Sequence, residues 1–121
     1  MAGLKAARTA LAAEITAAIA ASVVDPAGTV DVLPWDDAAV VAPAVTVATA
    51  GANALAWRLY VRIYVDAGQS QQDADLLDDL TEAIDLGLGD TTPRSSWEWQ
   101  YDDLKGLYLM TSVIEFARED F

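Results

Sequence analysis

Apolar and polar residues alternate without a break along residues 55–66. The apolar set is Leu55, Trp57, Leu59, Val61, Ile63 and Val65. The residues between them are Ala56, Arg58, Tyr60, Arg62, Tyr64 and Asp66. A period of two predicts a strand that buries one face and leaves the other polar. Because this segment is longer than most strands, we expect it to bend or to project beyond its sheet.

Two other segments follow the spacing of a helix. Along residues 4–21 the apolar stripe is Leu4, Ala7, Leu11, Ile15, Ala18 and Ile19. The many alanines of this segment favour the same structure, since alanine is the best helix former. A second stripe, which follows a break at residues 67–69, is Leu76, Leu77, Leu80, Ala83 and Ile84. Ser70 suits the N-cap of this second helix, and Gly87 and Gly89 suit its end.

Shorter patterns complete the expected order of elements. Residues 29–33 are a short strand candidate, residues 97–101 alternate, and residues 107–116 form an apolar run typical of a central strand. Residues 102–106 have the composition of a turn between the last two strands. The order predicts one α+β domain over residues 1–121, with a small mixed or antiparallel sheet and both helices packed on one face.

The segment 34–53 has no single pattern. Val40-Val41 and Val45-Thr46-Val47 are strand candidates, but Pro43 separates them and cannot donate to a sheet ladder. Small residues follow from Ala48 to Asn53 and have the composition of a loose turn. We therefore expect a long and partly mobile loop, or an arm, between the early strands. Loops of this length are usually functional or disordered.

The composition excludes several kinds of site. The chain of 121 residues has no cysteine and no histidine, and its net charge is −12 from 19 acidic and 7 basic residues. Disulfides, thiolate metal sites and Ser-His-Asp or Cys-His catalysis are therefore excluded. The negative charge opposes tight binding to nucleic acid through a basic patch, although it permits DNA to pass by. We expect no enzyme activity and no cofactor.

We expect no membrane segment either. No apolar run approaches the roughly 18 residues of a membrane span. Lys5 and Arg8 precede an alanine-rich stretch that has some features of a secretory signal. Glu14 interrupts that stretch, however, so an amphipathic helix is the better interpretation.

Carboxylates occupy the outer face of the second predicted helix: Asp75, Asp78, Asp79 and Glu82. They could bind a divalent cation or form a catalytic pair, with Asp78 and Glu82 as the best pair. Cations of this kind prefer oxygen ligands that converge from a loop, and no calcium-loop pattern is present. A solvated helix face is the simpler interpretation. The face could also steer partners or keep DNA from adhering.

Two groups of residues are candidates for subunit contacts. Trp97, Trp99 and Tyr101 form an aromatic stripe, which is typical either of an interface or of a strand that faces the core. Arg58 and Arg62, with Tyr60 and Tyr64, lie on the polar face of the long strand. These arginines could bind carboxylates of a neighbouring subunit or pair with the acidic helix of their own chain.

The order of elements resembles that of a known family. The chain has an alanine-rich first helix, then Val30-Asp31-Val32-Leu33-Pro34, a proline-interrupted segment around Pro43, the long strand Trp57–Val65, an acidic helix around Asp73–Ile84 and a closing strand. This arrangement is similar to that of the small tail terminator (tail completion) proteins of long-tailed phages, and to other small neck and head–tail joining proteins. The resemblance covers nearly the whole chain, and it rests on element order without an invariant motif.

The resemblance implies a structural protein of the virion, located in the tail or neck and assembled in the host cytoplasm. It implies a homo-oligomeric ring, commonly a hexamer, that caps the tail tube and joins it to head connector or neck proteins. DNA would pass through an acidic lumen, and the segment 34–53 would engage the tube. The family has no catalytic motif, so the resemblance assigns no catalytic residue.

Three other functions stay open from the sequence. The first is a connector or stopper protein on the head side of the neck. The second is an acidic binding module that imitates DNA. The third is an enzyme that uses a pair of carboxylates, which we consider the least favoured because no other polar group is expected to converge on them.

Overall fold

The computed structural model describes residues 3–22, 28–36, 40–52, 55–66, 71–89 and 92–117. Within these residues, the fold consists of two helices and five strands. Their bounds, in chain order, are α1 Leu4–Ala21, β1 Asp31–Leu33, β2 Ala44–Ala52, β3 Ala56–Asp66, α2 Gln71–Leu88, β4 Glu98–Asp102 and β5 Leu107–Ala117. Ser70, the predicted N-cap of the second helix, lies outside the described residues.

All five strands belong to one mixed sheet with the order β1-β2-β3-β5-β4. The short β1 runs parallel to β2, and the other neighbouring strands are antiparallel. The long strand β3 is central and pairs with β5 along its whole length, from Ala56 opposite Ala117 to Asp66 opposite Leu107. Its pairing with β2 contains a bulge between Thr49 and Gly51. The strand with the clearest alternation is therefore the one around which the sheet is built.

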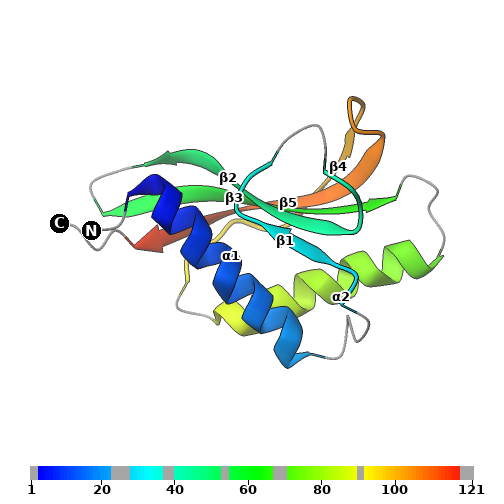
Figure 1. Cartoon of the computed structure of the whole chain (residues 1–121), viewed down its shortest axis with the longest axis horizontal. Helices are drawn as coiled ribbons and strands as arrows, with labels where there is room; N and C mark the ends of the chain where they lie inside the picture. The colour runs from blue at the N-terminus through cyan, green and yellow to red at the C-terminus, as the bar shows by residue number, and fades with distance from the viewer. Residues whose placement is uncertain are drawn as a thin grey trace.

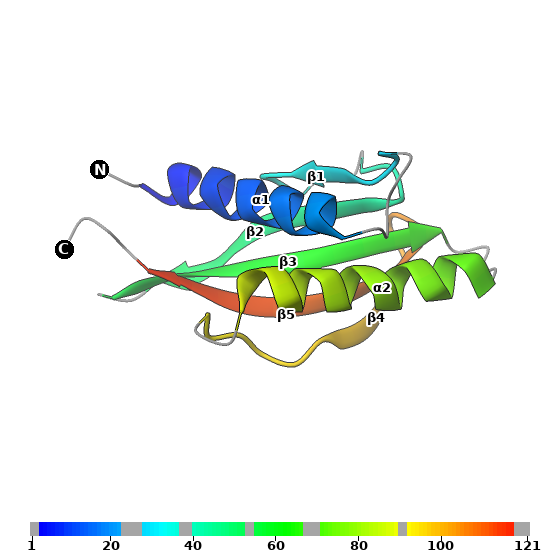
Figure 2. The same ribbon diagram turned by 90° about the horizontal axis from the view of Figure 1, so that it is seen from below.

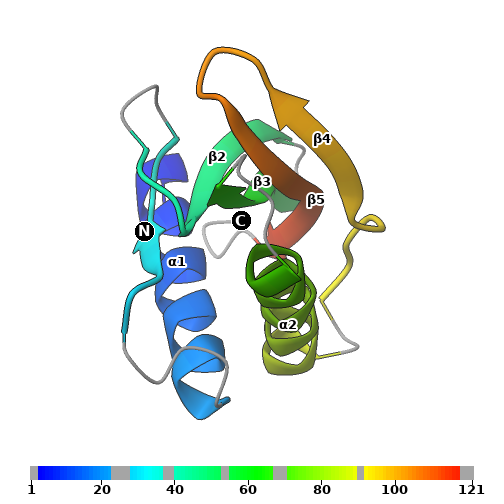
Figure 3. The ribbon, with the colours of Figure 1, turned by 90° about the vertical axis from the view of Figure 1, so that its right-hand side faces the viewer.

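Both helices cover the same face of the sheet, as Figure 2 shows from below and Figure 3 from one end. The core lies between the two layers. Its buried residues are Ala7, Leu11, Ala12, Ile15, Ile19, Val45, Val47, Leu59, Val61, Ile63, Val65, Leu77, Leu80, Ile84 and Ile114. Full burial of a leucine or isoleucine contributes about 1.5–3 kcal/mol before conformational entropy is subtracted. The predicted fold class, an α+β sheet with two helices on one face, is confirmed.

The interpretation of residues 34–53 as a partly mobile loop or arm is wrong for residues 44–52, which include the strand candidate Val45-Thr46-Val47. Residues 44–52 form β2, which pairs with β3 on one side and with β1 on the other. Arg8 on α1 also donates to the carbonyl of Pro34 (3.1 Å) and to the hydroxyl of Thr49 (3.3 Å). Pairing with β3 supplies backbone hydrogen bonds that the composition of small residues did not reveal. Residues 37–39 and 53 lie outside the described residues.

The face of the sheet away from the helices, called the open face below, is partly covered. Val40, Ala44, Tyr64, Leu107 and Leu109 form a second buried apolar cluster there, with Leu33 and Ala42 packed against it. Figure 1 shows the described parts of the segment between β1 and β2 near the turn that joins β4 to β5, and Asp36 lies 3.4 Å from Lys105 of that turn. The two segments therefore border the end of the open face where polar residues from distant parts of the chain meet.

Candidate functional site

The polar face of β3 leads to the first polar cluster. Leu59, Val61 and Ile63 point into the core, so the residues between them lie on the open face. Arg58 is exposed near the beginning of the strand, and Arg62 lies further along it. Tyr60 lies between them, and the guanidinium of Arg62 stands over its ring at 4.5 Å from the ring centre.

The segment before β2 supplies a carboxylate that binds the far end of this face. Asp36 accepts from Nη1 of Arg62 at 2.9 Å and from the hydroxyl of Tyr64 at 2.7 Å, both through Oδ2. Its other oxygen, Oδ1, lies 3.4 Å from Nζ of Lys105 in the β4–β5 turn. The Asp36 side chain is only 7% exposed. We call Asp36, Arg62, Tyr64, Lys105 and Asp102 the Asp36 cluster.

The turn between β4 and β5 positions Lys105 for this contact. Asp102 accepts from the backbone N–H groups of Leu104 (3.0 Å) and Lys105 (3.1 Å), which is typical of an Asx turn. Its Oδ2 also lies 3.2 Å from Nζ of Lys105. Gly106 closes the turn with a φ of 67°, which favours glycine. The lysine is thus held between two carboxylates, one from its own turn and one from the segment before β2.

The contacts of the Asp36 cluster shift its pKa values. Burial acts to raise the pKa of Asp36, but the hydrogen bonds from Tyr64 and Arg62 and the charge of Lys105 outweigh it and hold this pKa below its usual value. Burial, together with the bond to Asp36 and its charge, raises the pKa of Tyr64. The pKa of Asp102 is lowered, mainly by the backbone N–H of Lys105. A carboxylate held ionised and a phenol held protonated are suited to cross-linking segments and poorly suited to exchanging protons at neutral pH.

A solvent-open pocket of about 500 Å³ lies beside the Asp36 cluster. Arg62, Tyr64, Lys105 and Leu109 are among its lining residues, with Leu104 at its rim. The charges that line it have both signs, and those of the Asp36 cluster are paired with each other. Asp103, which also lines the pocket, is exposed and has no ion pair among the described contacts. Within the described ranges, no group of three or more acidic residues is arranged to hold a metal ion. The pocket is therefore a recess between two cross-linked segments, and most of the charges that line it are engaged by one another.

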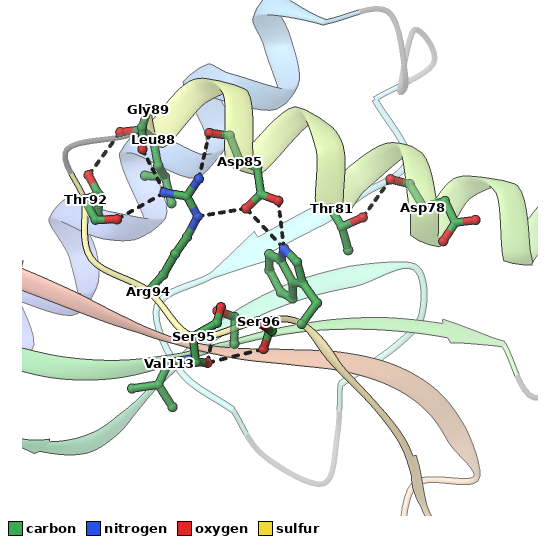
Figure 4. Close-up of polar contacts among 12 residues, drawn as sticks. Asp78, Thr81, Asp85, Leu88, Gly89, Thr92, Arg94, Ser95, Ser96 and Val113 are labelled. Carbon is green, nitrogen blue, oxygen red and sulfur yellow. Dashed lines mark hydrogen bonds and ion pairs between the residues drawn. The ribbon is translucent and has the colours of Figure 1, made fainter.

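A second polar cluster ties the end of α2 to the segment before β4 (Figure 4). Asp85 accepts from Nε of Arg94 at 3.0 Å and from the indole N–H of Trp97 at 3.1 and 3.2 Å. Arg94 also donates to the backbone carbonyls of Gly89 (2.7 Å), Thr92 (3.1 Å) and Asp85 (3.4 Å). A cation at carbonyls close to the C-terminus of a helix interacts favourably with the helix dipole. We call Asp85, Arg94 and Trp97 the Asp85 cluster.

The predicted subunit-contact residues divide into two groups. Tyr64 is 1% exposed, so the prediction that it contacts a neighbouring subunit is wrong for this conformation. Arg62 binds Asp36 of its own chain, a partner that lies outside the acidic helix we had considered. Arg58 is exposed and Tyr60 is half-buried, so these two remain at the surface. The strand pattern identified the correct face but not the segment that covers half of it.

The aromatic stripe of residues 97–101 also divides into partly buried and exposed members. Trp97 packs against the core and bonds to Asp85, as the core-facing alternative predicts. Trp99 and Tyr101 are 53% and 48% exposed. Tyr108 of β5, which the sequence pattern did not indicate, stacks on Trp99 at 5.4 Å between ring centres and lies 4.8 Å from the ring centre of Tyr101. We call Trp99, Tyr101 and Tyr108 the aromatic group.

The acidic face of α2 is exposed as predicted. Asp75, Asp78, Asp79 and Glu82 all lie at the surface, while Leu77, Leu80 and Ile84 are buried on the opposite side. The Asp78 side chain has no hydrogen bond among the described contacts, although its backbone carbonyl accepts from the hydroxyl of Thr81 at 2.7 Å. The position of these carboxylates follows from the 3.6-residue period of the helix alone.

Sequence reasoning missed Asp36, Lys105, Asp85 and Arg94. Asp36 stands 26 residues before Arg62, and no local pattern distinguishes it from other acidic residues. Arg94 carried a weak signal, because a basic residue soon after a helix end often binds the last carbonyls. The contacts of Asp36 and Lys105 depend on strand order, which periodicity does not predict.

Comparison with known proteins assigns no family. No family model matches the chain, and no curated protein matches its sequence. Within the described residues, neither helix combines the length and the apolar character needed to cross a membrane.

Proposed function

We propose that this chain is a structural virion protein that caps a phage tail tube as an oligomeric ring and forms the joint to the head. The proposal rests on the resemblance of its element order to tail terminator proteins, and two properties of the molecule support it. The first is a surface suited to protein contacts. The second is that the carboxylates of its two polar clusters are already bound by donors of the same chain.

Among the structural observations, the aromatic group gives the proposal its main support. Trp99 and Tyr101 lie on β4, the edge strand of the sheet, beside Tyr108. About half of the surface of each is exposed. Contact between an aromatic side chain and water is unfavourable. Aromatic residues are enriched at protein interfaces, because they bury a large area and keep a polar atom. A protein surface that covers the aromatic group would remove this unfavourable contact with water and so stabilise the complex.

The polar clusters support a structural role. Asp36 and Asp85 are the acceptors at the centre of the two clusters, and each is engaged by donors from a different segment. Catalysis by a carboxylate needs an ionisable group within reach of a substrate, with a pKa near the working pH. The low pKa of Asp36 and its cross-linked position oppose that use.

Native mass spectrometry of the purified chain tests the oligomer. We expect a ring in the wild type, and a shift toward smaller species in the variant Trp99→Ala/Tyr101→Ala. Leu104→Ala is the matched control, since Leu104 is an exposed apolar residue of the neighbouring turn. A wild type that stays monomeric at high concentration, and does not bind tail tubes, contradicts the proposal.

Electron microscopy of particles that lack the protein tests the position in the virion. Overlong tails, or finished tails that do not join heads, support the tail terminator. Filled heads that leak DNA indicate the connector or stopper on the head side instead. Normal particles contradict both assignments.

A further inference from the structure

Two exposed cations and the acidic face of α2 lie on different parts of the surface. Lys5 and Arg58 are exposed, and neither takes part in an ion pair within the described part of the chain. Glu115 is the cross-strand neighbour of Arg58, yet the two form no ion pair. The carboxylates on the acidic face of α2 also have no ion pair among the described contacts.

These charges of opposite sign are separated along the longest axis of the molecule. Lys5 is the second residue of α1 and Arg58 is the third residue of β3. Figures 1 and 2 show that α1 and β3 begin at the same end of the molecule, whereas α2 begins at the other end. Asp75, Asp78 and Asp79 lie in the first half of α2. The exposed cations and these carboxylates therefore cannot meet within one chain.

The carboxylates also lie close to one another. Asp75 and Asp79 are four positions apart, and Asp75 and Asp78 are three apart, so they are neighbours on the helix surface. Like charges at these spacings destabilise a helix, and an arriving cation offsets the repulsion. A guanidinium suits this role because it can bind two carboxylate oxygens at once.

We propose that Arg58, with Lys5 at the same end, contacts the acidic face of α2 in a second copy of this chain. The inference rests on the proposed function, because it names the subunit contact of the ring. Two copies that each carry a charge of −12 repel unless the cations of one meet the carboxylates of the other. A contact between different patches of two identical chains is heterologous, and such contacts build rings or filaments.

Charge exchange between two variants tests this contact in the full-length chain. Arg58→Glu and Asp78→Lys are purified separately, and self-association is measured by sedimentation at low ionic strength. We expect each variant to raise the dissociation constant about tenfold, since each places like charges opposite each other. In an equimolar mixture Glu at position 58 meets Lys at position 78, so we expect association to return to nearly the wild-type level.

Matched controls separate this contact from general charge effects. Glu14→Lys changes the net charge as Asp78→Lys does, at an exposed position in the middle of α1, and should not weaken association. Arg58→Gln is the second variant, which removes the cation without adding a carboxylate beside Glu115. Circular dichroism checks that each variant is folded.

Two results overturn the inference in distinguishable ways. If the wild type associates and the mixture is no better than its components, the contact is elsewhere and the proposed oligomer stands. If the wild type does not associate at any concentration, the oligomer itself is refuted.

Discussion

The Asp36 cluster and the Asp85 cluster use the same chemistry on opposite faces of one sheet. Each has an aspartate that binds an arginine and one further donor, Tyr64 or Trp97. They differ in burial, because the Asp36 side chain is 7% exposed and that of Asp85 is 38% exposed. They differ also in reach, since Asp36 joins three distant segments and Asp85 joins two neighbouring ones.

This difference in burial and in the segments joined determines how much each cluster contributes to the stability of the fold. A buried carboxylate that loses its partners leaves unpaired charges in a poorly solvated place, so its removal is costly. A surface ion pair contributes little, because water and salt replace the partner. We therefore expect the Asp36 cluster to hold the segment before β2 over the open face, and the Asp85 cluster to add modestly to the attachment of α2.

The largest expected effect is that of Asp36→Ala. The change leaves Arg62 and Lys105 without their shared carboxylate, and we expect unfolding free energy to fall by about 3 kcal/mol. Urea denaturation of both proteins measures it. Asp103→Ala is the control, because Asp103 is an exposed carboxylate of the adjacent turn. If Asp36→Ala lowers the unfolding free energy no more than Asp103→Ala does, the Asp36 cluster is not the stronger of the two clusters.

Gly87→Ala tests how much of the attachment of α2 depends on packing. A Cβ at position 87 would meet the Cβ of Ala18 on α1 well inside van der Waals contact. Overpacking costs about 1–3 kcal/mol, and the higher helix propensity of alanine offsets about 1 kcal/mol of this cost. We therefore expect the unfolding free energy to fall by about 1.5 kcal/mol.

A second substitution checks the origin of that loss. Ala18→Gly makes room for the added methyl, so the double variant should be more stable than the sum of the two single changes predicts. Chemical denaturation of all four proteins gives this coupling energy. If the two single changes in unfolding free energy simply add in the double variant, the helices accommodate the extra methyl without a clash at Ala18.

Asp85→Ala should have a smaller effect. Arg94 keeps its bonds to the carbonyls of Gly89 and Thr92, and the lost contacts are half-exposed, so we expect a loss of about 1 kcal/mol. Asp79→Ala is the control in the same helix, since both changes gain the same helix propensity. If Asp85→Ala destabilises the protein as strongly as Asp36→Ala, burial does not explain the difference between the clusters.

The smallest expected effect is on the acid dependence of stability. The pKa of Asp36 is lower in the folded chain than in the unfolded chain, so its stabilisation is present above about pH 4 and disappears as pH falls through the folded value. The wild type should therefore lose stability more steeply on acidification than Asp36→Asn. Thermal unfolding across this pH range measures the slopes, and parallel slopes would contradict the assignment.

The elements that sequence predicted best are those with a long, uninterrupted period. The first helix was expected at residues 4–21 and is observed at Leu4–Ala21, and the long strand was expected at residues 55–66 and is observed at Ala56–Asp66. In both cases a single face is buried, so one periodicity describes every residue. Residues 44–52 were harder because small residues have no strong preference, and pairing with β3 decides their structure.

The candidate site was less predictable than the fold. The alternation placed Arg58, Tyr60, Arg62 and Tyr64 together on one face of β3, and the structure confirms that shared face. It did not indicate that Asp36 and Val40 cover the end of this face and bury Tyr64. The acidic face of α2 was predictable because its exposure depends only on the residues buried behind it.

By itself the sequence determined which residues are helical, which form the long strand and which side of each is apolar. It determined too that histidine and cysteine chemistry is absent. Only the tertiary structure decided which polar residues are covered and which remain free. The physical reason is range: periodicity acts between residues a few positions apart, whereas Asp36 meets Arg62, Tyr64 and Lys105 only after five strands have taken their order in the sheet.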